Sequence, residues 1–275
     1  MSTQAPDSSA VLTFIGVSII ASVIFNILFG RGIGDVSCMY PVKFSPANGA
    51  FAIWTPIYLF SILTLAEQIH SRSVNSGHYE TFLANLCYGL TWAFAALWTS
   101  AFTQKIKQGG SEVPNPMGLL LAAVFLCLAA VSSMITVFTS TAWERSGKGS
   151  MRWISGVAIG LLSGWVVVAA AINVAIAYKV FNANDEDTET PCDTNDDKYT
   201  ILSQVNSDYS TFVPLALSVA MCVVCVALIF SQRPNPIILI PLMWALFWMR
   251  PSIPNYFAAG LVMIVETIVL IVAFT

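Results

Sequence analysis

The chain has 275 residues, of which 56% are hydrophobic and only 10% are charged, whereas about a quarter of the residues of an average soluble domain are charged. This composition excludes an ordinary soluble domain and predicts a polytopic integral membrane protein. The formal net charge of -3 is unevenly distributed, because eight of the fifteen acidic residues lie between residues 183 and 208. We interpret this segment as a solvated polar loop, with contact to a cation or to a basic partner as the alternative.

Eight apolar stretches follow one another along the chain, and most are near the roughly 20 residues that a membrane-spanning helix needs. They therefore predict an all-α, polytopic membrane helical bundle. The seventh stretch is short and contains Pro236 and Pro241, so we expect it to be tilted, kinked or re-entrant. The stretches cover approximately residues 11 to 29, 50 to 68, 82 to 103, 117 to 139, 153 to 180, 211 to 230, 236 to 249 and 255 to 274.

The first connection, from Gly30 to Asn48, is rich in glycine and proline, which favours turns over regular structure. The second stretch then opens with aromatic residues. Trp54 and Tyr58 are four residues apart, so a helix places them on one face. Pro56 between them is expected either to kink the helix or to lie in its first turn.

The third stretch repeats aromatic residues at intervals of four, at Phe94, Trp98 and Phe102. This spacing gives one face of the helix an aromatic surface. For Trp98 we consider two roles, namely contact with a ligand and anchoring or packing near the membrane interface.

The fifth stretch has two parts with different expected roles. Gly156 and Gly160 form a step of small residues that permits close contact with another helix. Trp165, Ala169 and Asn173 follow at intervals of four, so they share a face. A buried amide is costly unless it has a partner, and an indole beside a small residue leaves a flat wall next to a gap. We interpret these three residues as one wall of a binding pocket.

These residues, taken in order, resemble the translocator protein and tryptophan-rich sensory protein (TspO/MBR) family over roughly residues 11 to 182. The second stretch is similar to a Trp-Thr-x-x-Tyr element of the family, and Leu97-Trp98-Thr99 is similar to its Leu-Trp-Ser/Thr element. Trp165, Ala169 and Asn173 match family residues at the same offsets. Ala95 departs from the family, which often has Asn there.

The resemblance implies a core of five membrane helices at residues 11 to 182, followed by the acidic loop at 183 to 208 and a three-helix extension at 209 to 275. It implies binding of porphyrins, sterol-like lipids or other flat ligands, with no required cofactor, and it implies that homodimers are common. The ligand-binding residues expected by resemblance are Trp54, Tyr58, Trp98, Trp165, Ala169 and Asn173.

Two further pairs of residues are candidates for function. Glu266 lies near the middle of the last stretch and Asn26 lies in the first, so either side chain could provide a polar or proton-carrying group inside the membrane. Cys38 and Cys192 fall in connections that a count of eight helices places on the same side. They could form a disulfide, which would make that side oxidising.

We therefore predict a receptor, sensor or carrier for a flat apolar ligand such as a tetrapyrrole, a sterol or a similar lipid. The alternatives are a proton-coupled transporter that uses Glu266 and an accessory subunit of a larger membrane complex. We do not expect an enzyme, a metal site or a nucleic-acid partner, because no Walker loop, metal-spaced His and Cys cluster or nucleophile elbow is found. The positively charged residues divide almost equally between the two sides, so the orientation stays open.

Overall fold

The computed structural model describes residues 8–39, 48–73, 81–108, 111–140, 153–182 and 235–249. Its elements are long helices, one two-stranded hairpin and short helices. In chain order they are α1 (Ser8–Met39), the 3-10 helix η1 (Asn48–Ile53), α2 (Trp54–Ser73), α3 (Phe82–Phe102), β1 (Lys105–Gln108), β2 (Ser111–Pro114), α4 (Pro116–Thr139), α5 (Trp153–Asn182), the 3-10 helix η5 (Pro236–Ile238) and α7 (Leu239–Met249).

Five of these helices, α1 to α5, are long and apolar enough to cross a membrane. The predicted all-α polytopic bundle is therefore confirmed. The stretches predicted at 82 to 103, 117 to 139 and 153 to 180 end within one or two residues of α3, α4 and α5. These ends were predictable because each apolar run is uninterrupted and is bounded by polar residues or turn formers.

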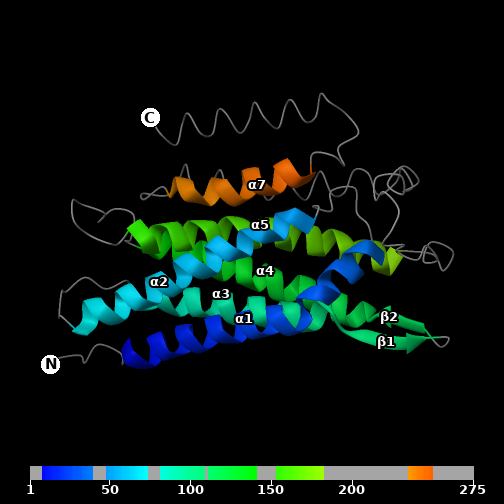
Figure 1. Cartoon of the computed structure of the whole chain (residues 1–275), viewed down its shortest axis with the longest axis horizontal. Helices are drawn as coiled ribbons and strands as arrows, with labels where there is room; N and C mark the ends of the chain where they lie inside the picture. Colours follow the sequence, from blue (N-terminus) through cyan, green and yellow to red (C-terminus); the bar gives the residue numbers. More distant parts are fainter. Residues whose placement is uncertain are drawn as a thin grey trace.

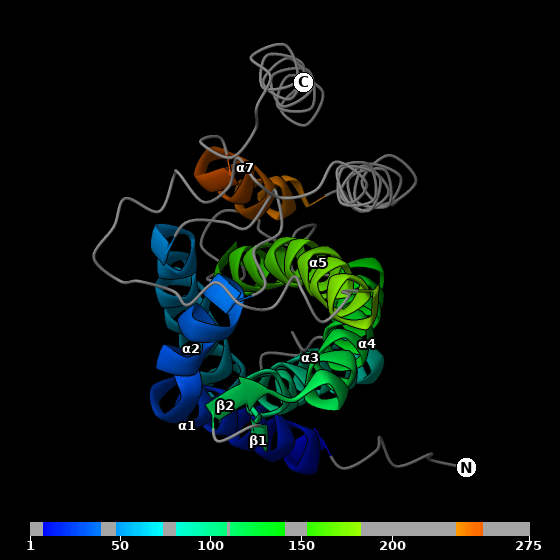
Figure 2. The same cartoon turned by 90° about the vertical axis from the view of Figure 1, so that its right-hand side faces the viewer.

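The five long helices form a ring in the order α1, α3, α4, α5, α2, which Figure 2 shows end-on. In this ring α3 packs between α1 and α4, and α5 packs between α4 and α2. Nearly all of α5 is buried. The core of the molecule therefore lies along the inward faces of α3 and α5, and the candidate site is built there.

Local sequence signals explain where three of the helices begin. The Thr81 side chain accepts a hydrogen bond from the backbone N–H of Ala84 at 3.1 Å and caps α3. Asn115 caps α4 in the same way, and Pro116 occupies the first turn of α4. Pro56 lies in the first turn of α2, where its missing N–H breaks no helical hydrogen bond. One of the two positions expected for Pro56 is thereby found.

The turns predicted from Gly30 onward are wrong for residues 30–39, which continue α1. A glycine in a helix costs only about 1 kcal/mol relative to alanine, so tertiary packing overrides it. Ile33 and Val36 are buried, and a Cβ on Gly32 would lie 3.2 Å from the Thr103 side chain. The close approach of α1 to the end of α3 is the packing that extends the helix. Residues 40–47 of this connection lie outside the described residues.

A β-hairpin that the sequence analysis did not predict joins α3 to α4. β1 and β2 pair antiparallel, with Lys105 opposite Pro114 and Gln108 opposite Ser111. The backbone N–H of Asn115 donates to the carbonyl of Gln104 at 2.9 Å, which closes the base of the hairpin. Figure 1 shows the hairpin projecting beyond the end of the bundle where α3 ends and α4 begins.

The described part of the C-terminal region, Asn235–Met249, packs on α5 and is called the C-terminal segment below. The Asn235 side chain donates to the carbonyl of Gly156 at 2.8 Å. A Cβ on Gly160 would lie 2.8 Å from the Cβ of Ile237, and a Cβ on Gly164 would collide with the carbonyl oxygen of Ile238. The close contact predicted at Gly156 and Gly160 is therefore present, and its partner is the C-terminal segment.

The described part of the seventh apolar stretch is too short to cross a membrane as a straight helix. α7 has 11 residues, which corresponds to about 16 Å at 1.5 Å per residue against a hydrocarbon core of about 30 Å. α7 also contacts η1 through Trp244, whose indole N–H donates to the carbonyl of Ala50 at 2.8 Å. The sixth and eighth stretches and the acidic loop lie outside the described residues.

Substitution of Gly164 tests the contact between α5 and the C-terminal segment. Gly164→Ala places a methyl group against the Ile238 carbonyl, and overpacking of this kind typically costs about 1 to 3 kcal/mol. Gly30→Ala is the matched control, because its Cβ meets nothing within 4 Å and alanine favours a helix. We expect Gly164→Ala to lower the free energy of unfolding in detergent micelles and Gly30→Ala to leave it unchanged or raise it. Equal stability of the two variants would contradict this packing.

Candidate functional site

Inside the ring of helices, η1, α2, α3 and α5 bring their aromatic side chains together. The rings form one connected group, called the aromatic cluster below, because each lies within 6.5 Å of at least one other member. Its members are Phe51, Trp54, Tyr58, Tyr88, Trp92, Trp98, Phe102 and Trp165.

Trp54 is the centre of the aromatic cluster. Its ring centroid lies 5.5 Å from that of Tyr58, 6.3 Å from those of Trp92 and Trp165, and 6.5 Å from that of Trp98. The indoles of Trp54 and Trp98 are nearly parallel, at 21°, whereas Trp165 meets Trp54 edge-on at 82°. Both arrangements suit the charge distribution of aromatic rings. The structure thus brings four of the predicted site residues into contact with one another.

The amide of Asn173 is paired within the protein. The indole N–H of Trp98 donates to Asn173 Oδ1 at 2.9 Å, and Asn173 Nδ2 donates to the carbonyl of Ala169 at 2.9 Å. The amide predicted to contact a ligand thus joins α3 to α5 and fixes the orientation of the Trp98 ring. A buried amide requires a hydrogen-bond partner, and for Asn173 this partner is the Trp98 indole of the aromatic cluster.

The predicted wall of Trp165, Ala169 and Asn173 borders a small cavity. The cavity has a volume of about 30 Å³, which is roughly the room that one water molecule occupies. Trp165, Ala169 and Asn173 therefore line the same small cavity, and their role as the wall of a ligand pocket stays a prediction. The lining residues are Ile33, Ser37, Phe51, Trp98, Phe102, Trp165, Ala169, Ile172, Asn173 and Ile176.

Tyr58 joins the aromatic cluster to α1 through its hydroxyl group. Asn26 Nδ2 donates to Tyr58 Oη at 2.7 Å and to the carbonyl of Ser22 at 3.0 Å. The hydroxyls of Ser22 and Tyr58 lie 3.2 Å apart. Asn26, which the sequence analysis considered as an isolated polar group in the membrane, therefore has partners on its own helix and on α2.

Sequence reasoning did not select Trp92 and Phe51 as site residues. Trp92 is fully buried and lies 5.2 Å from Tyr58, measured between ring centroids. Phe51 meets Trp165 edge-on at 6.2 Å. The available signals were the four-residue spacing of Tyr88 and Trp92 and the position of Phe51 three residues before Trp54. Neither signal distinguishes a site residue from ordinary packing.

The remaining polar and cysteine residues add no described member to the aromatic cluster. Glu67 of α2, an acidic residue that was not named as a candidate above, accepts a hydrogen bond from the Ser155 hydroxyl at 2.8 Å and so joins α2 to the start of α5. Cys38 lies in the last turn of α1, where a loop was expected, and Cys192 lies outside the described residues. Glu266 also lies outside them, so the disulfide and the proton-carrying acid stay predictions.

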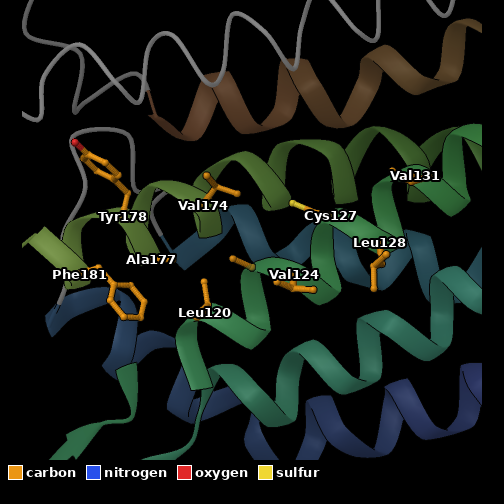
Figure 3. A pocket seen from close by; sticks show the side chains of 10 residues that line it. Leu120, Val124, Cys127, Leu128, Val131, Val174, Ala177, Tyr178 and Phe181 are labelled. Atoms are coloured by element: carbon orange, nitrogen blue, oxygen red, sulfur yellow. The ribbon is translucent and has the colours of Figure 1, made fainter. Parts of the chain in front are cut away.

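A larger depression of about 500 Å³ lies between α4 and α5 (Figure 3), and it contains none of the predicted site residues. Val131 and Leu128 on its edge are exposed, so the depression opens on the outer face of two spans. Lipid chains contact such a face in a bilayer. We therefore do not assign the ligand site to this depression, although it is larger than the cavity beside Trp165. Its lining comprises Leu120, Ala123, Val124, Cys127, Leu128, Val131, Val174, Ala177, Tyr178 and Phe181.

A double-mutant cycle tests the hydrogen bond between Trp98 and Asn173. Trp98→Phe leaves a buried carbonyl unpaired and Asn173→Leu leaves a buried indole N–H unpaired, and each loss costs about 1 to 3 kcal/mol. We expect the double variant to be less destabilised than the sum of the single variants, by about 1 kcal/mol in the free energy of unfolding. Additive losses would show that the two side chains do not interact.

Comparison with known proteins agrees with this geometry. The sequence model of the TSPO-like protein family matches residues 8–192, which include all five long helices and the aromatic cluster. No curated protein and no solved structure matches the chain. Together with five helices long enough to span a membrane, the match identifies an integral, multi-pass membrane protein. The chain belongs to the TSPO-like protein family.

Proposed function

We propose that this protein is a membrane receptor, sensor or carrier that binds a flat apolar ligand at the aromatic cluster. The ligand classes that suit the cluster are tetrapyrroles, sterols and similar lipids. The observation that carries the proposal is the contact of Trp54 in α2 with Trp92 and Trp98 in α3 and with Trp165 in α5. Indole faces bind flat apolar molecules through stacking and burial.

Binding requires the aromatic cluster to open, because the existing cavity of about 30 Å³ holds none of these ligands. Trp54 is the side chain whose displacement opens it most directly. It touches both Trp98 and Trp165, and it is the first residue of α2, directly after the 3-10 helix η1. Hydrogen bonds in a 3-10 helix have poorer geometry than those of an α-helix, so this segment is the part of the wall that moves at least cost.

A flat ligand can replace the contacts that Trp54 makes. The ring of Trp54 lies nearly parallel to that of Trp98. A ligand ring inserted between Trp98 and the displaced Trp54 would stack on both faces, so the interactions lost on opening would be recovered. The small side chain of Ala169 on the neighbouring wall leaves room for the edge of such a ligand.

In this mechanism Asn173 is a positioning residue. Its carbonyl holds the Trp98 indole, and its amide group is bonded to the preceding turn of α5. Trp98 therefore presents one ring face to the inserted ligand without having to be ordered on binding, which reduces the entropic cost of association.

The two other functions considered from the sequence have less support among the described residues. A proton-coupled transporter requires Glu266, which lies outside them. An accessory subunit would have its aromatic faces covered by partner helices, whereas the aromatic cluster is covered by the helices of this chain. Homodimerisation, implied by resemblance to the family, is compatible with ligand binding and remains a separate proposal.

Tryptophan fluorescence tests the proposed function. Titration of the purified protein in nanodiscs with a porphyrin should quench the fluorescence in a saturable manner, and a sterol should compete with the porphyrin. We expect the double variant Trp165→Ala with Asn173→Ala to bind at least tenfold more weakly. Truncating a well-packed aromatic residue in a binding site typically costs about 2 kcal/mol or more of binding free energy, and about 1.4 kcal/mol corresponds to a tenfold change in the dissociation constant.

Trp153→Phe is the control for this titration. Trp153 lies at the opposite end of α5, is 48% exposed and contacts Phe60 rather than the aromatic cluster. Its loss should change the fluorescence intensity and leave the dissociation constant unchanged. Absence of saturable quenching, or equal affinities of the double variant and the wild type, would rule out the site.

A further inference from the structure

Two tryptophans of the aromatic cluster have buried indole N–H groups without a hydrogen-bond partner. Among the described residues, Nε1 of Trp54 and of Trp165 lacks any acceptor. The side chains are 7% and 2% exposed, respectively. Buried polar groups in proteins are nearly always hydrogen-bonded, so two such donors in rings that touch each other call for an explanation.

The acceptor side chains near Trp54 and Trp165 are already engaged. Asn173 Oδ1 accepts from Trp98, and Tyr58 Oη accepts from Asn26. Trp92 differs, because it lies against Tyr88, whose hydroxyl donates to Ser61 Oγ at 2.7 Å and keeps its oxygen available as an acceptor. The unsatisfied polar groups at Trp54 and Trp165 are therefore hydrogen-bond donors.

The described residues around the aromatic cluster also offer no compensating charge in its interior. The buried polar side chains in the described part of the chain are all Ser, Thr or Asn. The cations Arg31, Lys105 and Lys107 are exposed, and Lys179 is only partly buried. A carboxylate in the aromatic cluster would lose its hydration without gaining an ionic partner, which is strongly unfavourable.

From these observations, and resting on the proposed function, we infer that the site selects uncharged flat ligands that carry hydrogen-bond acceptors. A ketone or ester oxygen satisfies an indole N–H without bringing a charge or a further donor. A plain hydrocarbon leaves the N–H groups unpaired, and a carboxylate has to keep its charge outside the aromatic cluster. The ligand class is therefore a neutral carbonyl compound of flat shape.

Contacts between indole N–H groups and ring faces are a competing way to satisfy these donors. Trp54 and Trp165 meet at 82°, an edge-to-face geometry compatible with such a contact. An N–H directed at a ring face is weaker than an N–H bonded to a carbonyl oxygen. A ligand carbonyl that reaches Nε1 would therefore displace it.

Three probes with the same tricyclic skeleton test the inference: fluorene, 9-fluorenone and fluorene-2-carboxylate. Binding to the full chain in nanodiscs is measured by equilibrium dialysis, with free concentrations corrected by nanodiscs that contain no protein. One neutral hydrogen bond is worth about a two- to tenfold change in the dissociation constant. We expect 9-fluorenone to bind about two- to tenfold more tightly than fluorene, and the carboxylate to bind more weakly than both.

The matched variant replaces the Trp165 indole, which borders the cavity, by the isosteric benzothiophene side chain, which has no N–H. This change keeps the two-ring shape and removes the donor. We expect it to reduce the preference for 9-fluorenone over fluorene and to leave the affinity for fluorene unchanged. The same replacement at Trp153, which lies outside the aromatic cluster, should alter neither affinity.

A second measurement observes the donors directly. In protein with 15N-labelled indole groups, 9-fluorenone should shift the Nε1–H resonance of Trp54, of Trp165 or of both downfield, whereas fluorene should not. Equal binding of fluorene and 9-fluorenone, a preference that survives the Trp165 replacement, or tightest binding of the carboxylate would each overturn the inference and leave the proposed function standing. If none of the probes and no porphyrin binds, the proposed function fails and the inference fails with it.

Discussion

The hydrogen bond between Trp98 and Asn173 is the interaction on which the interior of this protein depends. It joins α3 to α5, the two most completely buried of the five long helices, at a distance of 2.9 Å. Within a bilayer the alternative to this bond is an unpaired amide and an unpaired indole in hydrocarbon, so each group holds the other in place. The bond orients the Trp98 ring against Trp54, and it occupies the side-chain carbonyl of Asn173, which lies beside the aromatic cluster. The geometry of the cluster and its excess of donors both follow from it.

α5 serves two interfaces, which explains why it is apolar on every side. Trp165, Ala169 and Asn173 face the interior of the ring, whereas Gly160 and Gly164 lie against the C-terminal segment. A helix that is covered all around has no polar face to expose, in agreement with its nearly complete burial. The C-terminal segment also reaches η1 through the hydrogen bond from Trp244, so the region beyond the family match is in direct contact with the turn that leads to the aromatic cluster.

The aromatic cluster is closed in this structure, and its closed form agrees with a binding function. A rigid empty pocket lined by four indoles would expose a large apolar surface, which the rings avoid by packing on one another. The closed cluster keeps the N–H groups of Trp54 and Trp165 unpaired, so it is not the arrangement of lowest energy for the polar atoms. The conflict between good ring packing and unsatisfied donors is the physical reason for expecting that a ligand with suitable acceptors shifts the cluster to an open form.

The sequence by itself determined the class of protein, the extents of three spans and the spacing that places Trp54 and Tyr58 on one face, because hydropathy and helical periodicity act over short distances along the chain. Only the tertiary structure decided that α1 continues through its glycines, that Trp92 belongs to the aromatic cluster and that Asn26 is paired with Tyr58. The hairpin was signalled by Gly109-Gly110 between two short strands, but only its pairing establishes it. The partner of Asn173 was equally undetermined, because residues 75 positions apart meet only when the helices pack. Contacts between distant residues depend on the arrangement of whole helices, and no local pattern in the sequence encodes that arrangement.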